Sequence, residues 1–284
     1  AHVRPCLAQV LAATGPEAEI LLALGQDGTP DVAQRAAAAA ALRDPRVRLL
    51  HLPMPRFNYA RVNNLAARAA TGDLLLLLND DVAPLVAGWL AHLAAHLADP
   101  AIGAAGPRLL YPDGTVQHAG IVMGLGGLCE HAGRHRAGTD PGPWGRAHLD
   151  HDVSAVTGAC LLTTRAAYAA LGGLDEAYPS AFNDVDYCLR LRASGLGVIY
   201  AGSLALVHHE LQTYGNHYAG PRAGERAAET GRFAARWAAA IAADPFHSPN
   251  LSLTPGAEWD LAFPPRTAAW RRAEAVAFGS RPPV

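Results

Sequence analysis

Cysteine is scarce in this chain of 284 residues, and long apolar runs are lacking. The four cysteines (Cys6, Cys129, Cys160 and Cys188) are far apart and form no Cys-x-x-Cys pair, which argues against a zinc ribbon or a disulfide framework and favours a reducing cytosol. No stretch approaches the roughly 18 apolar residues of a membrane span, and none resembles a signal peptide. We therefore expect a cytoplasmic protein whose membrane contact, if any, is peripheral and at the inner face.

Excess charge is lacking as well. Charged residues make up 17% of the chain and the net charge is −2, so we expect no nucleic-acid partner. Neither a Gly-rich phosphate loop nor the zinc spacing His-Glu-x-x-His occurs. Hydrophobic residues make up 50%, which is typical of a globular protein with one large domain, or one domain with an appendage.

The most informative stretch is a run of five leucines at 74–78, followed at once by Asn79, Asp80 and Asp81. A leucine run without polar alternation predicts a strand buried on both faces. Open α/β sheets bind ligands at the carboxyl ends of their strands, where these acids emerge. Adjacent carboxylates suit magnesium or manganese, which would relieve their repulsion. The alternative is an ordinary turn, in which Asn and Asp are common.

Helical and extended patterns alternate along the first part of the chain. Helices are expected at 4–13, 31–42 and 60–70, and strands at 19–24, 47–52 and 74–78. This alternation predicts parallel βαβ units. Further on we expect a helix at 84–97, a hairpin around Asp113-Gly114, a long loop at 126–152, a strand at 153–163 and a helix at 165–171.

A second informative stretch is 182–192, whose apolar spacing predicts a helix. Asn183 or Asp184 would cap its start, and Asp186 would lie in its first turn, where acids favour the helix dipole. A carboxylate at the start of a helix beside an open loop is equally well placed as a general base.

The remaining features are a histidine pair and the C-terminal part. His208 and His209 follow a short extended segment, and either could be structural or a metal ligand. We expect one helix or two between 219 and 243, then an extended tail anchored by Trp259 and Trp270. The predicted division is a catalytic domain at 1–215 and, at 216–284, a C-terminal helix and tail packed on it.

Taken together, these segments resemble family 2 of the inverting, nucleotide-sugar-dependent glycosyltransferases, above all the bacterial branch that builds surface polysaccharides and O-antigens. The matching stretches, in chain order, are Asn-Tyr-Ala-Arg-Val-Asn-Asn-Leu at 58–65, the leucine strand with Asn79-Asp80-Asp81, Tyr-Pro-Asp-Gly-Thr-Val-Gln-His-Ala-Gly at 111–120, Val-Ser-Ala-Val-Thr-Gly-Ala-Cys-Leu at 153–161, Gly-Gly-Leu-Asp-Glu at 172–176, Phe182–Arg192, His208-His209-Glu210 and Ser-Pro-Asn-Leu-Ser-Leu at 248–253. Each matching stretch alone is weak evidence for the resemblance, but their occurrence together in the same order is specific to the family.

The resemblance implies an α/β fold of the GT-A type, with a Rossmann-related, mostly parallel sheet flanked by helices, a small hairpin and a C-terminal helical extension. It implies a nucleoside-diphosphate sugar as donor, a glycan or lipid-linked glycan as acceptor, and a divalent cation, Mn²⁺ or Mg²⁺. The family opens with a strand that precedes the first residue here, Ala1, so we expect a donor pocket without that strand.

The resemblance also assigns residues. Asn79–Asp81 matches the family's Asp-x-Asp motif, with Asp81 as the metal contact and Asp80 beside the donor. Asp184 matches the catalytic base, and His208 or His209 matches a histidine that reaches the metal in some members. Two more donor-side matches are Asn64 and Asp27, the latter in a Gly-Gln-Asp-Gly turn that departs from the family pattern.

The function that these expectations support is inverting transfer of a sugar to a glycan hydroxyl, with the loop at 126–152 closing over the acceptor. One alternative is a catalytically silent GT-A-like module that binds a glycan or a partner. Another is a metal-dependent nucleotidyltransferase, which the lack of a Gly-rich phosphate loop disfavours.

Overall fold

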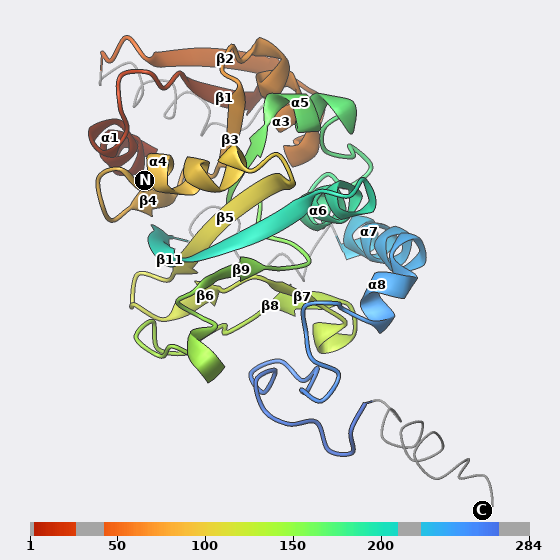
Figure 1. Ribbon diagram of the computed structural model, residues 1–284. Coiled ribbons are helices and arrows are strands. Elements are labelled where there is room, and N and C mark those ends of the chain that lie inside the picture. Colours follow the sequence, from red (N-terminus) through yellow and green to blue (C-terminus); the bar gives the residue numbers. More distant parts are fainter. Residues whose placement is uncertain (1–2, 27–42, 210–222, 267–284) are drawn as a thin grey trace, which may run out of the picture.

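The computed structural model describes residues 3–26, 43–209 and 223–266 (Figure 1). The helices are α1 (Val3–Ala13), α3 (Tyr59–Ala69), α4 (Trp89–Ala95), α5 (Arg165–Ala170), α6 (Asn183–Ala193), α7 (Ala223–Arg236) and α8 (Ala238–Ala242), with short 3₁₀ helices η1 (His96–Ala98), η2 (Leu125–Gly127) and η3 (Pro143–Gly145). The strands are β1 (Ile20–Gln26), β2 (Val47–Pro53), β3 (Leu74–Leu78), β4 (Val82–Pro84), β5 (Ile102–Leu110), β6 (Val116–His118), β7 (Ile121–Met123), β8 (Cys129–His131), β9 (Asp150–Asp152), β10 (Cys160–Thr164) and β11 (Gly197–His208). The helix expected at 31–42, Asp27 and Trp270 lie outside the described residues.

The centre of the fold is a seven-stranded mixed sheet. Five strands follow the order β3-β10-β5-β11-β4, with β6 paired to β5 and β9 paired to β11. Strands β5 and β11 run parallel and lie side by side in the middle of the molecule (Figure 1). Strand β10 is antiparallel to both of its neighbours, β3 and β5.

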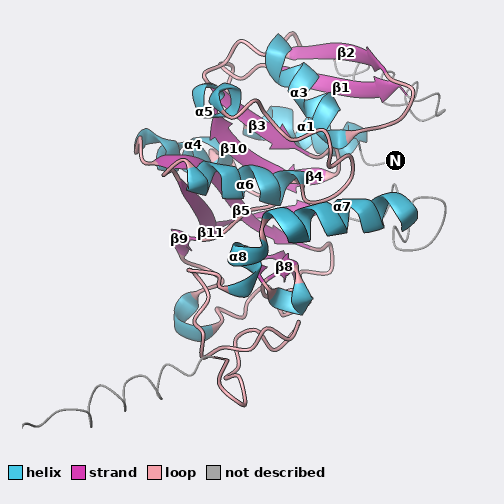
Figure 2. Cartoon of the chain, turned by 90° about the vertical axis from the view of Figure 1, so that its right-hand side faces the viewer, coloured by secondary structure: helices cyan, strands magenta, loops and turns pink. Residues whose placement is uncertain are grey.

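Helices cover both faces of this sheet, as the sequence predicts. Successive residues of a strand point to opposite faces, so Ala104 and Leu161 belong to one hydrophobic core while Ala105 and Leu162 belong to another. The first core receives side chains from α3, α5, α6 and α7, and the second from α4. Figure 2 shows α6, α7 and α8 lying in front of the strands on one side. The result is a three-layer α/β architecture.

The leucine strand β3 departs from the prediction of burial on both faces. Leu75 and Leu77 are buried in the first core, whereas Leu76 and Leu78 are half-buried and Leu74 is 41% exposed. The reason is its place in the sheet: β3 ends the described strand order, and a cavity of about 1780 Å³ lies beside it. The prediction of full burial is therefore wrong for one face of the strand.

Strands β1 and β2 form a parallel pair, as expected from the βαβ pattern. Leu7 and Leu11 of α1 pack against this pair. Among the described residues no strand ladder joins β1 to β3, and Figure 1 shows the pair standing apart from the central sheet. Side chains of β1, β3 and α1 line the cavity together.

Two further segments differ from the predictions. The helix expected at 84–97 begins only at Trp89, because Pro84 belongs to a ladder with β11, opposite Leu206, and Gly88 has a positive φ of 76°. The loop expected at 126–152 contains the short elements β8, η3 and β9, and β9 extends the central sheet. Most of this segment is therefore part of the folded body.

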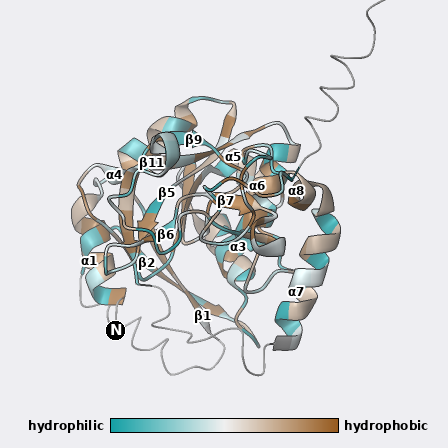
Figure 3. Cartoon of the chain, turned by 90° about the horizontal axis from the view of Figure 1, so that it is seen from below, coloured by the Kyte–Doolittle hydropathy of each residue, from teal (hydrophilic) through white to brown (hydrophobic). Residues whose placement is uncertain are grey.

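The C-terminal part packs on the same body. Phe233 of α7 is fully buried and stacks on Phe182, with ring centroids 4.7 Å apart. Trp259 is buried, as predicted for an anchor, with Arg136 lying 4.8 Å above its ring. In Figure 3 the strands are largely apolar and α7 alternates between polar and apolar residues. The predicted boundary between 215 and 216 lies outside the described residues and stays a prediction. None of the described helices has the length and hydropathy of a membrane span.

Candidate functional site

The turn between β3 and β4 carries the acids that the sequence singles out. Asn79, Asp80 and Asp81 fill this turn, and the N–H of Asn79 donates to the carbonyl of Ala159 at 2.9 Å. Strand β4 pairs with the end of β11, where Val82 lies opposite His208. This pairing brings the acidic turn and the histidine pair together from positions more than a hundred residues apart.

Asp81 and His208 form the centre of the site. Asp81 Oδ1 lies 3.0 Å from His208 Nε2, and the two side chains are only 13% and 8% exposed. Burial on its own would raise the pKa of the Asp81 carboxyl, but the hydrogen bond and positive charge of His208 outweigh it and hold that pKa below its ordinary value. Asp81 is therefore a carboxylate at neutral pH.

The side chains of Asp81 and His208 have the ligand atoms that a divalent cation needs. His208 Nδ1 lies 2.7 Å from Gln117 Oε1, so Nδ1 donates its proton to this amide oxygen and the other ring nitrogen, Nε2, faces Asp81. Two acceptors 3.0 Å apart need a proton or a cation between them. A ligating histidine usually donates its other N–H to an acceptor such as this amide oxygen. A cation would be held here by Asp81 and His208.

Of the two histidines that the sequence leaves open, His208 makes the side-chain contact with Asp81 at 3.0 Å. His209 is half-buried, and its backbone N–H donates to the carbonyl of Asp81 at 3.0 Å. Asp80 is half-buried and lines the same cavity. Burial first, and then the charges of Asp81 and Asp80, raise the pKa of the Cys6 thiol on α1 to about 11. This thiol is therefore protonated at neutral pH and is no nucleophile.

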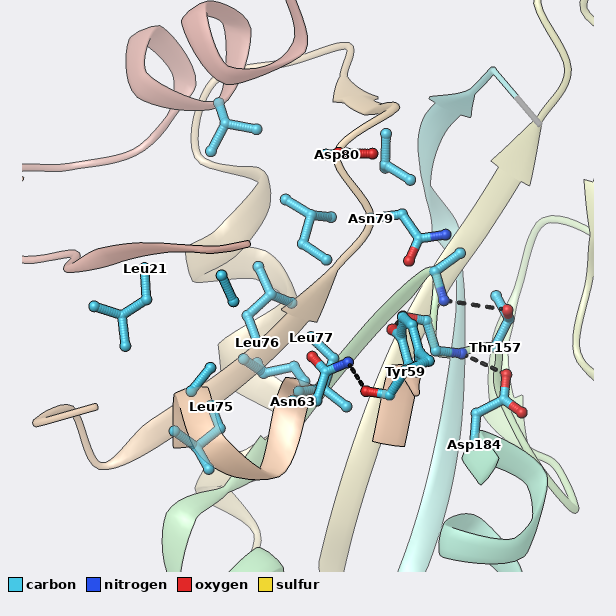
Figure 4. A pocket seen from close by; sticks show the side chains of 18 of the residues that line it. Leu21, Tyr59, Asn63, Leu75, Leu76, Leu77, Asn79, Asp80, Thr157 and Asp184 are labelled. Atoms are coloured by element: carbon cyan, nitrogen blue, oxygen red, sulfur yellow. Dashed lines mark hydrogen bonds between the residues drawn. The ribbon is translucent and has the colours of Figure 1, made fainter. Parts of the chain in front are cut away.

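Asp184 faces the same cavity from α6. Its Oδ2 accepts a hydrogen bond from the N–H of Gly158 at 2.7 Å, and its Oδ1 accepts one from the N–H of Val185 at 2.8 Å. The hydroxyl of Tyr59 donates to the carbonyl of Gly158 at 2.7 Å. Figure 4 shows Asn79 and Asp80 at the strand end, with Tyr59 and Thr157 between them and Asp184. The arrangement sets a fixed carboxylate across from the acidic turn.

The predicted helix cap at this point is wrong. The N-cap of α6 is Phe182, with φ of 61° and no capping side chain, in place of Asn183 or Asp184. Stacking of Phe182 on Phe233 favours this backbone, and it leaves the Asp184 carboxylate directed at the loop that contains Gly158. A Cβ on Gly158 would lie 3.2 Å from the Cβ of Asp184, so a larger residue would require Asp184 to shift by a few tenths of an ångström.

Asp186 has a structural role. Its fully buried carboxylate accepts hydrogen bonds from Arg190 at 2.7 Å and from the indole of Trp237 at 3.0 Å, and it pairs with Arg236 at 3.1 Å. These partners tie α6 to α7. Replacing it would leave the largely buried guanidinium of Arg190 without its counter-charge.

Asn64 also has structural contacts in place of the predicted donor contact. Its amide nitrogen donates to the carbonyl of Leu174 at 2.9 Å, and its oxygen accepts from the hydroxyl of Tyr168 at 2.7 Å and the N–H of Leu174 at 2.9 Å. The neighbouring Asn63 lines the cavity. The structure thus gives Asn64 the task of holding α3 to the loop before α6, and Asp27 lies outside the described residues.

Asn64→Ala is expected to lower the free energy of unfolding by at least about 2 kcal/mol, because several buried groups would lose their partner at roughly 1–3 kcal/mol each. Urea unfolding measures this loss. Asn63→Ala is the matched control, since Asn63 makes one bond, to the carbonyl of Tyr59 in its own helix. Weakened nucleotide binding by a fully stable Asn64→Ala protein would contradict the structural role.

The sequence interpretation missed several residues of the site. Gln117 and Tyr59 act through contacts with partners about ninety residues away, which no local pattern reveals. Glu130, His131 and Arg134, from the segment predicted to close over the acceptor, line the cavity. A signal was present for two of these five: Gln117 and Tyr59 lie inside the stretches that carry the family resemblance.

Comparisons with known proteins show which family and which fold this chain is similar to. Residues 1–137 match the family model Glycosyl transferase family 2. The O-antigen biosynthesis protein RfbC of Myxococcus xanthus is 40% identical over 168 residues, which cover 59% of this chain. The N-acetylglucosaminyl-diphospho-decaprenol L-rhamnosyltransferase of Mycobacterium tuberculosis is 29% identical over 236 residues, covering 75% of this chain and 74% of that protein.

The chain spans only part of some relatives. It covers 23% and 13% of the length of the two curated relatives that are 38% and 40% identical to it. Among solved structures, the mannosyltransferase PcManGT of Pyrobaculum calidifontis, in complex with GDP-Man and Mn²⁺, superposes with a TM-score of 0.56 at 20% identity, covering 99% of this chain and 72% of that one. This similarity concerns the fold.

The α/β layers and the acidic turn at a strand end define a protein of the GT-A class, which confirms the predicted fold. Within that class the chain belongs to glycosyl transferase family 2.

Proposed function

We propose that this chain transfers a sugar from a nucleoside-diphosphate donor to a hydroxyl of a growing glycan, with inversion at the anomeric carbon. The observation that carries the proposal is the position of Asp184 across the cavity from the Asp81–His208 pair. A base on one side and a site for the diphosphate on the other are what a single displacement requires.

Asp184, Asp81 and His208 have different roles in the proposed reaction. Asp184 accepts the proton of the acceptor hydroxyl as its oxygen bonds to the anomeric carbon, and the bond from that carbon to the diphosphate breaks on the opposite side. The hydrogen bond from Gly158 holds the carboxylate in place. A divalent cation held by Asp81 and His208 would offset the charge that develops on the departing diphosphate.

The relatives support the substrate classes. The structural relative PcManGT was solved with GDP-Man and Mn²⁺, and the mycobacterial relative is named for a lipid-linked acceptor. By analogy we propose that the donor is a nucleotide sugar bound with Mn²⁺ or Mg²⁺. The proposed acceptor is a glycan or lipid-linked glycan of a bacterial surface polysaccharide. Glu130, His131 and Arg134 line the cavity and would provide polar contacts to such an acceptor.

The test is incubation with a panel of UDP-, GDP- and dTDP-sugars, with Mn²⁺ and candidate glycan acceptors. We expect release of nucleoside diphosphate that rises when the right acceptor is added. Release of pyrophosphate would instead indicate a nucleotidyltransferase. Binding of a donor or glycan without turnover would indicate a catalytically silent module.

A further inference from the structure

Two histidines on α4 and its extension face an aspartate from the edge of the central sheet. His92 and His96 are four residues apart and so lie on one face of the helical segment. Asp150 begins β9, which pairs with β11. One ligand atom from each of the three residues lies within 4.8 Å of the others. The cluster joins segments that are more than fifty residues apart in the chain.

The distances suit a tetrahedral metal. Asp150 Oδ2 lies 3.2 Å from His96 Nε2 and 3.8 Å from His92 Nε2, and the hydroxyl of Ser203 lies 3.0 Å from His92 Nε2. Zinc binds nitrogen and oxygen at about 2.0–2.2 Å, so tetrahedral ligand atoms lie about 3.3–3.5 Å from one another. The two distances from Asp150 Oδ2, 3.2 and 3.8 Å, bracket this value, and the ligand atoms of the three residues all lie within 4.8 Å of one another.

The contact between His96 and Asp150 is an ion pair that lacks hydrogen-bond geometry. His96 Nε2 is a buried atom that has no hydrogen-bond partner among the described residues, although the carboxylate of Asp150 is only 3.2 Å away. The other oxygen of Asp150, Oδ1, accepts the N–H of Ser203 at 2.9 Å. This bond fixes the carboxylate so that Oδ2 faces the two imidazoles, as supporting bonds do for metal ligands.

The types of ligand atom distinguish this cluster from the Asp81 site. Two imidazoles with one carboxylate favour zinc and its neighbours in the first transition row over magnesium. None of His92, His96 and Asp150 is among the described residues that line the cavity at Asp81. The cluster therefore lies outside the cavity that contains the Asp81 site.

We propose that His92, His96 and Asp150 bind one Zn²⁺ ion, with the Ser203 hydroxyl or a water molecule as fourth ligand. The ion ties α4 to β9 and β11. Helix α4 and strand β11 share the second hydrophobic core and β9 pairs with β11, so binding stabilises one face of the sheet. Its effect is on folding and not on turnover.

The test uses untagged protein, freed of metal with a chelator and then titrated with Zn²⁺. We expect wild type to bind one more Zn²⁺ per chain than His96→Ala, by elemental analysis, and to gain melting temperature on Zn²⁺ addition where the variant does not. Affinity at this site should fall by at least about 100-fold in His96→Ala. Co²⁺ should give wild type a tetrahedral absorption spectrum that the variant lacks.

Two further variants make the result specific. Asp150→Asn keeps an oxygen for the Ser203 N–H while removing the charged ligand, so it should lose zinc affinity with little change in the stability of the metal-free protein. His135→Ala is the matched control, because His135 is exposed and stacks on Tyr111 away from the cluster. Equal zinc content and equal thermal shifts in wild type, His96→Ala and Asp150→Asn would overturn the proposal.

Discussion

Asp184→Asn is expected to lower the rate of sugar transfer by at least about two orders of magnitude while folding changes little. Asparagine cannot accept the proton of the acceptor hydroxyl. Its oxygen can still accept one of the two backbone N–H groups, from Gly158 or Val185, so the loss of stability should be about 1 kcal/mol. Initial rates, donor affinity by calorimetry and melting temperature measure the three quantities.

The control is Asp99→Asn. Asp99 also accepts a backbone N–H, that of Ala101 at 2.9 Å, but it does not line the cavity. Asp186→Asn is unsuitable as a neutral control, because its carboxylate is buried among Arg190, Arg236 and Trp237 and its loss should destabilise the protein. Transfer at the parent rate by the Asp184 variant would show that the base lies elsewhere.

Asp81→Asn is expected to remove the dependence of nucleotide binding on a divalent ion. For wild type, Mn²⁺ should tighten the binding of a nucleoside diphosphate at least about tenfold, since a cation between carboxylate and diphosphate contributes several kcal/mol. The variant loses the charged ligand beside His208, so its affinity should be the same with and without Mn²⁺. Isothermal calorimetry gives all four affinities.

Asp73→Asn is the matched control for this experiment. Asp73 precedes β3 at the opposite end from Asp81, and its side chain is 98% exposed. Its removal should leave both affinities unchanged. If wild type binds the nucleotide equally with and without Mn²⁺, Asp81 has no metal role in donor binding.

Much of the architecture follows from local sequence patterns. The helical spacing at 60–70 and 182–192 predicted α3 and α6 to within a residue or two, and the apolar runs predicted β1 and β2. The predicted start of α4 was too early because Pro84 ends a ladder with β11, opposite Leu206. A ladder between residues more than a hundred positions apart leaves no periodic signal.

The candidate site shows the same limit. Asp81 and Asp184 were recognised as candidates because each stands at the end or start of an element with a clear pattern. The error over the cap of α6 arose because the aspartate was expected to follow the usual preference for an N-cap. A tertiary contact, the stacking of Phe182 on Phe233, decides the backbone instead. The pairing of Gln117 with His208, and of Gly158 with Asp184, is visible only in three dimensions.

Strand β11 contains an odd number of extra residues relative to its partner β5. This irregularity decides toward which face of the sheet each later side chain of β11 points. Ala201 lies opposite Pro107, whereas Ala205 lies opposite the next residue of β5, Arg108. Side chains alternate along a strand, so an odd insertion exchanges the two faces downstream. The same irregular segment presents Ser203 beside His92 and directs His208 toward Asp81. Inserting or deleting one residue in this segment would turn the His208 side chain away from the acids, whereas inserting or deleting two would preserve its direction.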